Sequence, residues 1–485
     1  MARKSDPELP LRLPIKLDPC SNGEYTPRPC SPVIARAQRV AHEIAARSAR
    51  RLGISRRAFL ESSCGAAAVL VALNQASGCG GGRYAVSSQA TEELALADAT
   101  MQGDEFVFDV QTHHVDVDRA WYASARPNIG GFLRRTARAW CDEPSWVQCY
   151  SRDRYVREVF MDSDTDLAVL SALWGDEEIN ANTIEGLAET RERLDRLGSR
   201  LRIHGIVLPE AHEPARTHER MQSLAERWRV SAWKLYPVWG PEGDGWWLDG
   251  DDGMRVIRRG IELGVPLFAV HKGLPLGGLD PEYAKPRDVG PVARAFPDAT
   301  FLVYHSAYDD AVTEGPHDPR AERGVDALIN TLRDHDIGRD GNVYAELGSA
   351  WREVMSRPDE AAHLIGKLLV HLGEDRILWG TDSIWYGSPQ DQIQAFRTFE
   401  ITPELQERFG YPALTPAIKA KIFGLNAARV YGVDPSEMHA AHAGDELARA
   451  REEHRARTAP SFTTYGPRTR RELLALDRAR GGRPD

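Results

Sequence analysis

The stretch Glu105-Phe-Val-Phe-Asp-Val-Gln-Thr-His-His-Val-Asp116 decides the fold. It opens with aromatic and β-branched residues, which is typical of a strand buried on both faces. It then becomes polar within two residues. Because side chains alternate along a strand, Gln111 and His113 point to the same side. The sequence therefore predicts a buried strand whose carboxyl end carries two side chains of an active site.

Seven further apolar runs follow this stretch, and helical segments separate them, as in a parallel sheet with crossover helices. The predicted strands after the first are 166–172, 201–208, 231–236, 266–270, 300–304, 342–345 and 377–380. Eight strands, each followed by a helix, is the number found in a (β/α)₈ barrel. We therefore predict an α/β fold, a TIM barrel over residues 105–434.

Two long insertions follow the first and fourth predicted strands. Residues 117–165 contain several tryptophans with Cys141 and Cys149, and residues 237–251 are rich in glycine and tryptophan. Both follow strand carboxyl ends, the face on which barrel active sites lie. They are predicted either as lid-like loops over a substrate or as surface loops fixed by buried tryptophans. The two cysteines form a disulfide in an oxidising compartment or stay as two free thiols.

Residues 1–78 have the features of an export leader. Residues 1–50 are rich in Pro, Ser and Arg, and the pair Arg56-Arg57 precedes an apolar run at 62–73. That run is shorter than the roughly 20 residues of a spanning helix, and the pattern resembles a twin-arginine signal. We predict a disordered leader that directs export to the periplasm. The alternative is a basic helix start that leads into a buried core helix.

Cys79 follows in the stretch Ala76-Ser-Gly-Cys-Gly-Gly-Gly82, which resembles a lipoprotein cleavage box with alanine where leucine is usual. Lipidation of Cys79 would anchor the protein to the outer face of a membrane. Residues 79–104 are predicted as a linker, and residues 435–485 as a charged C-terminal tail.

The composition limits the kinds of partner that the protein is expected to bind. A hydrophobic content of 42% allows a large buried core, and a net charge of −10 argues against nucleic-acid binding. A small-molecule substrate is the expected partner. The sequence leaves open whether the chain forms a homo-oligomer.

Polar side chains gather where the predicted strands end. After Gln111 and His113 they are Lys234 on the fourth strand, His271 and Lys272 on the fifth, His305 on the sixth, Glu346 on the seventh and Asp382 after the eighth. In a barrel these ends converge on one pocket. Imidazole and carboxylate suit a divalent ion with an open position for water, and such an ion lowers the pKa of its water to roughly 7. The sequence therefore predicts a metal-dependent site.

The order of these residues resembles the amidohydrolase superfamily, specifically its amidohydrolase-related branch. The motifs that carry the resemblance are Asp109-x-Gln-x-His113, His271, His305, Gly380-Thr-Asp382 and the stretches 296–305 and 421–432. The resemblance implies one divalent metal ion, zinc first with manganese or magnesium as alternatives. By it, His113 and His271 are metal ligands, Asp382 is a ligand or proton-transfer carboxylate, and His305 is the catalytic histidine.

Gln111 departs from the family pattern, which has His-x-His where this chain has Gln111-x-His113. A neutral glutamine offers a metal only its amide oxygen, a poorer zinc ligand than imidazole. With Gln111 among the predicted ligands, three alternatives stay open: a weaker or harder ion, a site completed by water, or a metal-free protein.

Lys234 has three interpretations. In two-metal members of the superfamily a lysine on this strand is carbamylated and bridges the ions. Lys234 otherwise binds a substrate carboxylate, alone or with Lys272, or it forms a structural ion pair with Glu346 across the barrel mouth. We predict substrate-binding roles for Lys234, Lys272 and Glu346.

The leading functional hypothesis is an exported metal-dependent hydrolase. It would use metal-activated water to cleave an amide, ester, lactone or C–C bond of a small carboxylated substrate. The second hypothesis is a non-oxidative decarboxylase of an aromatic or related acid at the same site. The third is a metal-free barrel that binds a ligand without converting it, and Gln111 is its main support.

Overall fold

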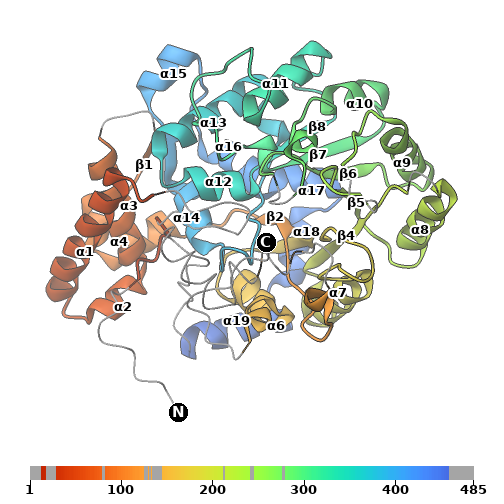
Figure 1. Ribbon diagram of the computed structural model, residues 1–485. Coiled ribbons are helices and arrows are strands. Elements are labelled where there is room, and N and C mark those ends of the chain that lie inside the picture. The colour runs from red at the N-terminus through yellow and green to blue at the C-terminus, as the bar shows by residue number, and fades with distance from the viewer. Residues whose placement is uncertain are drawn as a thin grey trace.

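The computed structural model describes residues 12–17, 29–78, 82–124, 129, 133, 145–210, 213–240, 245–275 and 279–457. One sheet of eight parallel strands lies at its centre (Figure 1). In sheet order the strands are β2 (Phe108–Thr112), β3 (Leu167–Leu170), β4 (Leu201–Ile206), β5 (Ala232–Leu235), β6 (Leu267–His271), β7 (Thr300–Tyr304), β8 (Val343–Glu346) and β9 (Ile377–Leu378). All eight coincide with predicted strands, and the predicted TIM barrel is confirmed.

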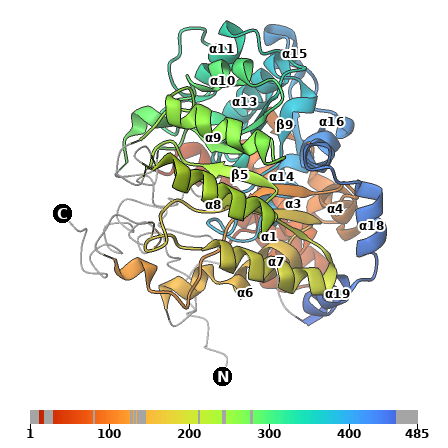
Figure 2. The ribbon, with the colours of Figure 1, turned by 90° about the vertical axis from the view of Figure 1, so that its right-hand side faces the viewer.

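The barrel closes between its first and last strands. Val110 N donates to Trp379 O at 3.0 Å, and Asp382 N donates to Gln111 O at 2.9 Å. Helices cover the outside of the sheet (Figure 2). They are α7 (Ile184–Gly198), α8 (Pro214–Glu226), α9 (Asp251–Glu262), α10 (Val289–Ala295), α11 (Gly324–Asp334), α12 (Gly348–Val354), α13 (Pro358–His371) and α14 (Gln390–Thr398).

Apolar side chains fill the barrel interior. The cluster includes Phe108, Val110, Leu167, Val169, Ala232, Ala269, Leu302, Tyr304, Tyr344 and Leu378. Because side chains alternate along a strand, the next inward positions toward the carboxyl ends are polar. On β5, β6 and β8 these positions are Lys234, His271 and Glu346.

The amino end of the barrel is covered by a π-helical turn at Lys421–Leu425 and by α17 (Asn426–Tyr431). Ala427 and Ala428 are buried against the interior cluster. Gly424 lies directly on the backbone of Phe106, so that a Cβ at this position would overlap the Phe106 carbonyl oxygen. This close approach requires glycine.

The N-terminal residues differ from the predicted leader. Helices α1 (Pro32–Leu52), α2 (Arg56–Leu60) and α3 (Ser63–Ser77) lie together on one flank of the barrel, near α14 (Figure 1). Residues 64–73 of α3 are all buried. The prediction of a disordered leader is therefore wrong for residues 32–77, and the alternative of a buried core helix describes α3. A run of small apolar residues suits both a signal and a core helix, so the sequence alone did not separate them.

The predicted linker and tail are also partly structured. Strand β1 (Gly82–Tyr84) pairs antiparallel with β10 (Phe399–Ile401). In the tail, α18 (Pro435–His442) precedes α19 (Glu446–Arg457). Arg451 Nε, on α19, donates to Phe160 O at 2.6 Å, so the tail up to residue 457 packs on the barrel.

The remaining leader and insertion predictions are only partly covered. Cys79 lies outside the described residues, so its lipidation stays a prediction. Cys149 is disulfide-bonded, and Cys141 lies outside the described residues. In the described parts of the insertions Trp121 and Trp239 are buried, as expected for loops fixed by tryptophans. Within the described ranges, no helix is both long and apolar enough to cross a membrane.

Replacement of Gly424 tests the packing at the amino end of the barrel. We expect Gly424→Ala to lower the free energy of unfolding by about 1–3 kcal/mol, because the added methyl group displaces the Phe106 backbone. Gly315 is the control, since nothing lies within 4 Å of a Cβ built there. Gly315→Ala should stay within about 0.5 kcal/mol of the wild type. Chemical denaturation followed by circular dichroism measures both, and equal values for the two variants would contradict the packing.

Candidate active site

A β-bulge directs the first two site residues inward. The register of β2 against β3 shifts between Asp109 and Thr112. Within this irregular stretch Val110 and its neighbour Gln111 both face the interior, and His113 does so after it. A bulge re-aims side chains in this way and is common next to active sites.

Asp382 is the centre of the site. Its Oδ1 lies 3.1 Å from His113 Nε2 and accepts from Gln111 Nε2 at 2.9 Å, while its Oδ2 accepts from Ser349 Oγ at 2.6 Å. Burial alone would raise the pKa of Asp382. The hydrogen bonds from His113 and Ser349, and the charges that His113 and His305 carry when protonated, outweigh burial and lower this pKa to about 2. The carboxyl group is therefore ionised at neutral pH.

His305 follows β7 with a left-handed backbone (φ 60°), which turns its ring into the site directly after the inward-facing Tyr304. The backbone N–H of Ser349 donates to His305 Nδ1 at 3.2 Å. Since that nitrogen accepts, the neutral ring carries its hydrogen on Nε2. Burial, with smaller effects from Lys234 and His113, lowers the pKa of His305 to about 4. His305 is thus a neutral N–H donor at neutral pH.

Gln111 lies between these two groups. Its Nε2 is 3.3 Å from His305 Nε2, so two donors face each other. Its Oε1 is buried without a hydrogen-bond partner and lies beside Gly348, where a Cβ would come within 2.6 Å of it. A half-turn of the carboxamide would give His305 an acceptor and would bring the oxygen next to Asp382. A cation between these two oxygens would make that arrangement favourable.

His271 is turned away from Asp382. Its Nε2 lies 3.1 Å from Leu274 O, and its ring stacks on Tyr236 with centroids 5.2 Å apart. Burial lowers the pKa of His271 well below its usual range, so the ring is neutral. The structure therefore brings His271 to the site wall but does not join it to His113 and Asp382.

Lys234 is fully buried, and its Nζ has no hydrogen-bond partner among the described residues. The nitrogen lies 3.5 Å from the ring centroid of Tyr304 and 4.5 Å from that of Tyr236. Burial lowers the pKa of Lys234 well below its ordinary range, and the carboxylates of Glu346 and Asp382 oppose this shift. The predicted ion pair with Glu346 is not formed among the described residues, since Lys234 Nζ and Glu346 Oε1 are both buried without a hydrogen-bond partner.

Glu346 instead supports the loop that carries His305. Its Oε2 accepts from the backbone N–H of His305 at 2.9 Å, and its Oε1 is buried without a partner. Burial raises the pKa of Glu346 well above its usual range, although the His305 hydrogen bond opposes this. Gly380 is required beside it, because a Cβ there would overlap Oε1.

Lys272 does not reach the site. Its ammonium group lies 2.8 Å from Asp288 Oδ1 and donates to Tyr283 O at 3.0 Å, and both charged residues are fully buried. Lys272 follows the inward-facing His271, so it points out of the barrel. The substrate-binding prediction for Lys272 is therefore not supported by its position.

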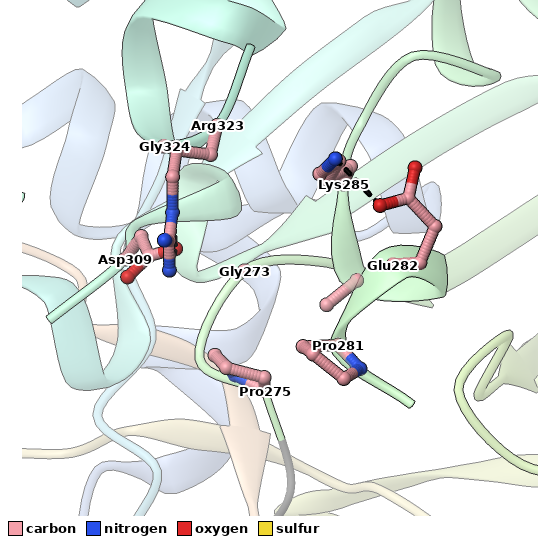
Figure 3. A pocket seen from close by; sticks show the side chains of 9 residues that line it. Gly273, Pro275, Pro281, Glu282, Lys285, Asp309, Arg323 and Gly324 are labelled. Carbon is pink, nitrogen blue, oxygen red and sulfur yellow. Dashed lines mark hydrogen bonds and ion pairs between the residues drawn. The ribbon is translucent and has the colours of Figure 1, made fainter. Parts of the chain in front are cut away.

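A small pocket of about 130 Å³ lies where the loops after β6 and β7 meet. Figure 3 shows Asp309 and Arg323 on one side and Glu282 and Lys285 on the other. Each side forms its own ion pair. Because these charges are already compensated, the pocket supplies no free charge to a substrate.

The donor set fits a divalent ion only in part. In the described part of the chain, no group of three or more His, Cys, Asp or Glu side chains is arranged to hold a metal ion. His113 Nε2 and Asp382 Oδ1 do meet, at 3.1 Å, and the unpartnered Gln111 Oε1 supplies a third donor after the half-turn described above. One nitrogen and two oxygens suit an ion that prefers oxygen ligands, such as manganese or magnesium, better than zinc.

Several site residues were not predicted from the sequence. Ser349 contacts both His305 and Asp382, and Trp385 stacks on His113 with centroids 5.3 Å apart. Tyr386 completes this side through a hydrogen bond of 2.9 Å to Ser349. Ser349 lies in the first turn of α12, after β8, and Trp385 and Tyr386 lie in the loop after β9, so inspection of strand ends alone passes over all three.

Comparisons with known proteins give the family. Similar solved structures include a TIM-barrel protein from Bordetella bronchiseptica (15% identity, 67% of this chain and 98% of that chain, TM-score 0.46). Another is 5-carboxyvanillate decarboxylase from Novosphingobium aromaticivorans in complex with manganese and a nitrobenzoic acid (14% identity, 69% of this chain and 99% of that chain, TM-score 0.46). A third is 4-oxalomesaconate hydratase from Rhodopseudomonas palustris (15% identity, 72% of this chain and 99% of that chain, TM-score 0.37). No curated protein sequence matches the chain. The amidohydrolase family model matches residues 184–433, more than half of the sequence, and the chain therefore belongs to the amidohydrolase family.

Proposed function

We propose that this amidohydrolase-family protein is a metal-dependent enzyme that acts on a small carboxylated aromatic substrate. The observation that carries the proposal is the buried, unpartnered Nζ of Lys234. Burial without a counter-charge is costly for an amine. A substrate carboxylate would supply the missing charge and hydrogen bonds, and binding energy would come from relief of this cost.

The walls of the site support an aromatic substrate. Tyr236 lies beside Lys234 and His271, and Trp385 stacks on His113. Flat side chains around a buried charge fit a planar ring that carries an anionic group. The proposed ligand is therefore a ring with a carboxylate directed at Lys234.

His113, Asp382 and the Gln111 oxygen would hold one divalent ion. The ion would act as a Lewis acid that stabilises negative charge on a substrate oxygen. The partnerless Gln111 oxygen supports this assignment. The choice of manganese or magnesium over zinc is part of the proposal.

Non-oxidative decarboxylation is the reaction that the site supports best. It requires a proton donor at the ring carbon that loses CO₂, and His305 presents a neutral Nε2–H held by the Ser349 backbone. Asp382, at a pKa of about 2, is a weak base, so it is poorly suited to remove a proton from water. The C–C bond to the carboxylate would break to release CO₂, the Nε2 proton of His305 would take its place on the ring carbon, and a proton taken up from solvent would restore the neutral His305 ring.

Hydrolysis is the second candidate. The ionised Asp382 accepts a hydrogen bond from Ser349, which in turn lies 2.9 Å from Tyr386. This chain of hydroxyl groups could receive a proton from an attacking water and deliver it to a leaving group. The hydrolase hypothesis from the sequence therefore keeps a specific structural basis.

Metal content tests the ion. We expect roughly one equivalent of a divalent ion in the purified protein, lost in His113→Ala and Asp382→Ala because each removes one of three donors. Asp375→Ala is the control, since Asp375 pairs with Lys421 at the surface. Elemental analysis after manganese, magnesium or zinc loading gives the counts. A wild-type protein that retains none of them would favour the metal-free binding barrel.

The two buried lysines should respond oppositely to replacement by methionine. Lys272→Met leaves Asp288 buried without its partner and should lower the free energy of unfolding by about 3–5 kcal/mol. Lys234→Met removes an unpartnered buried amine and should raise it by about 1–3 kcal/mol. Chemical denaturation measures both. A loss of stability in Lys234→Met comparable to that in Lys272→Met would show that Lys234 has a structural partner.

A panel of hydroxylated aromatic acids, beside matching esters and amides, tests the reaction. We expect release of CO₂, with one deuterium at the vacated carbon when the reaction runs in D₂O. His305→Gln should lower kcat by about 10²–10⁴-fold because the proton donor is lost. Lys234→Met should chiefly raise KM. Acid release from esters or amides without CO₂ would establish hydrolysis instead.

A further inference from the structure

The segment of residues 12–17 is buried against the loop that follows β9. Ile15 and Leu17 are each 1% exposed and Lys16 is 3% exposed. Lys16 uses its backbone as well as its side chain. Its Nζ donates to Asp391 Oδ1 at 2.7 Å and to Ser388 O at 3.1 Å, and its N–H donates to Asp391 Oδ2 at 3.0 Å. Both oxygens of a buried carboxylate are thus held by one residue 375 positions earlier in the chain.

The same loop forms one wall of the active site. Trp385 stacks on His113 with an interplanar angle of 13°, and Tyr386 contacts Ser349. The loop follows Asp382, which holds His113; Ser388 lies at its other end, and Asp391 lies just beyond, in the first turn of α14. Its geometry is therefore fixed at the site by Asp382 and on the far side by Lys16.

Hydrogen bonds within the loop and to Asp162 make the position of Trp385 depend on that of Ser388. Ser383 Oγ donates to Gly387 O at 2.9 Å, and the Gly387 N–H donates to Ile384 O at 3.1 Å. Ser388 Oγ donates to Asp162 O at 3.0 Å. Because the loop is compact, a shift at Ser388 would move Trp385 relative to His113.

The helices before Cys79 also belong to the packed structure. Residues 64–73 of α3 contribute to the same hydrophobic core as Phe396 and Ile393 of α14. Asn74, near the end of α3, exchanges hydrogen bonds with the backbone of Tyr84 at 2.7 and 2.9 Å. Loss of these residues would expose apolar surface on the helix that begins beside Asp391.

We propose that Lys16 is a positioning residue of the active site and that the N-terminal arm, of which residues 12–17 and 29–78 are described, stays with the barrel in the working protein. Lys16 fixes the end of the loop 383–388, and the loop fixes Trp385 on His113. This inference does not depend on the reaction proposed above. It differs from an export signal that is cleaved and lost.

Hydrogen exchange on the full-length protein tests the role of Lys16. Lys16→Met keeps the aliphatic stem but removes the ammonium group, and Lys421→Met is the control at a surface ion pair. We expect peptides from residues 383–391 to exchange at least about ten-fold faster in Lys16→Met, with residues 399–401 of β10 unchanged. Lys421→Met should leave residues 383–391 as in the wild type. Equal exchange in wild type and Lys16→Met, or faster exchange throughout the chain, would overturn the positioning role.

A spectroscopic signal distinguishes positioning from general support. Stacking on Trp385 should shift the ring-proton resonances of His113 upfield, and Lys16→Met should reduce that shift while Lys16→Arg restores it. If Lys16→Met fails to fold, Asp391→Asn provides the same comparison from the other partner. An unchanged His113 resonance in a folded variant would contradict the proposal.

The mature N-terminus tests retention of the arm. Intact-mass measurement of the protein purified from cells that process export signals should give a chain, or a tightly bound fragment, that includes residues 12–78. A folded protein that begins at Cys79 and lacks the arm would overturn this part of the proposal. That result would not change how the metal and CO₂ assays are interpreted. Failure of the arm proposal is therefore distinguishable from failure of the proposed function.

Discussion

The Asp382 carboxylate is the interaction on which the site depends. It accepts hydrogen bonds from His113, Gln111 and Ser349, and so ties the end of β2 to the loop after β8. Its own backbone N–H closes the barrel by donating to Gln111 O. One residue therefore completes the sheet and organises the polar groups at its mouth. The left-handed backbone of Asp382 (φ 58°) is a strained conformation that persists because contacts on both sides hold it.

Burial of unpartnered polar atoms is the cost of this arrangement. Lys234 Nζ, Glu346 Oε1 and Gln111 Oε1 all lie in the interior without hydrogen-bond partners. Residues selected for stability alone would be apolar at these positions. The Lys272–Asp288 pair shows the contrast, because there a buried lysine has a carboxylate at 2.8 Å. The same residue type is thus compensated where it supports the fold and uncompensated where a ligand is expected.

The sequence predicted the eight strands because each is an apolar run bounded by helices, and the barrel then places strand ends together without further information. It predicted His113, His305 and Asp382 for the same reason. The period-two alternation also shows why Lys272, next to the inward-facing His271, points outward. Ser349 lies at the start of α12 and Trp385 in the loop after β9, and tertiary contacts determine the positions of both. The orientation of His271 toward Leu274 O is likewise a packing outcome. For α3, composition alone did not distinguish an export signal from a core helix.

Gln111 adds a hydrogen-bonding capacity that the histidine of the family pattern lacks. A histidine at this position would present one ring nitrogen to an ion, and its second ring nitrogen, which then carries a hydrogen, could not accept from His305 Nε2–H. A carboxamide offers an oxygen and an NH₂ group, and Gly348 leaves space beside the end of the group that does not face Asp382. With its oxygen toward His305 Nε2–H and Asp382, Gln111 would join the proton donor to the ion. In the proposed arrangement this departure from the family pattern links the two halves of the site and favours an ion that prefers oxygen ligands.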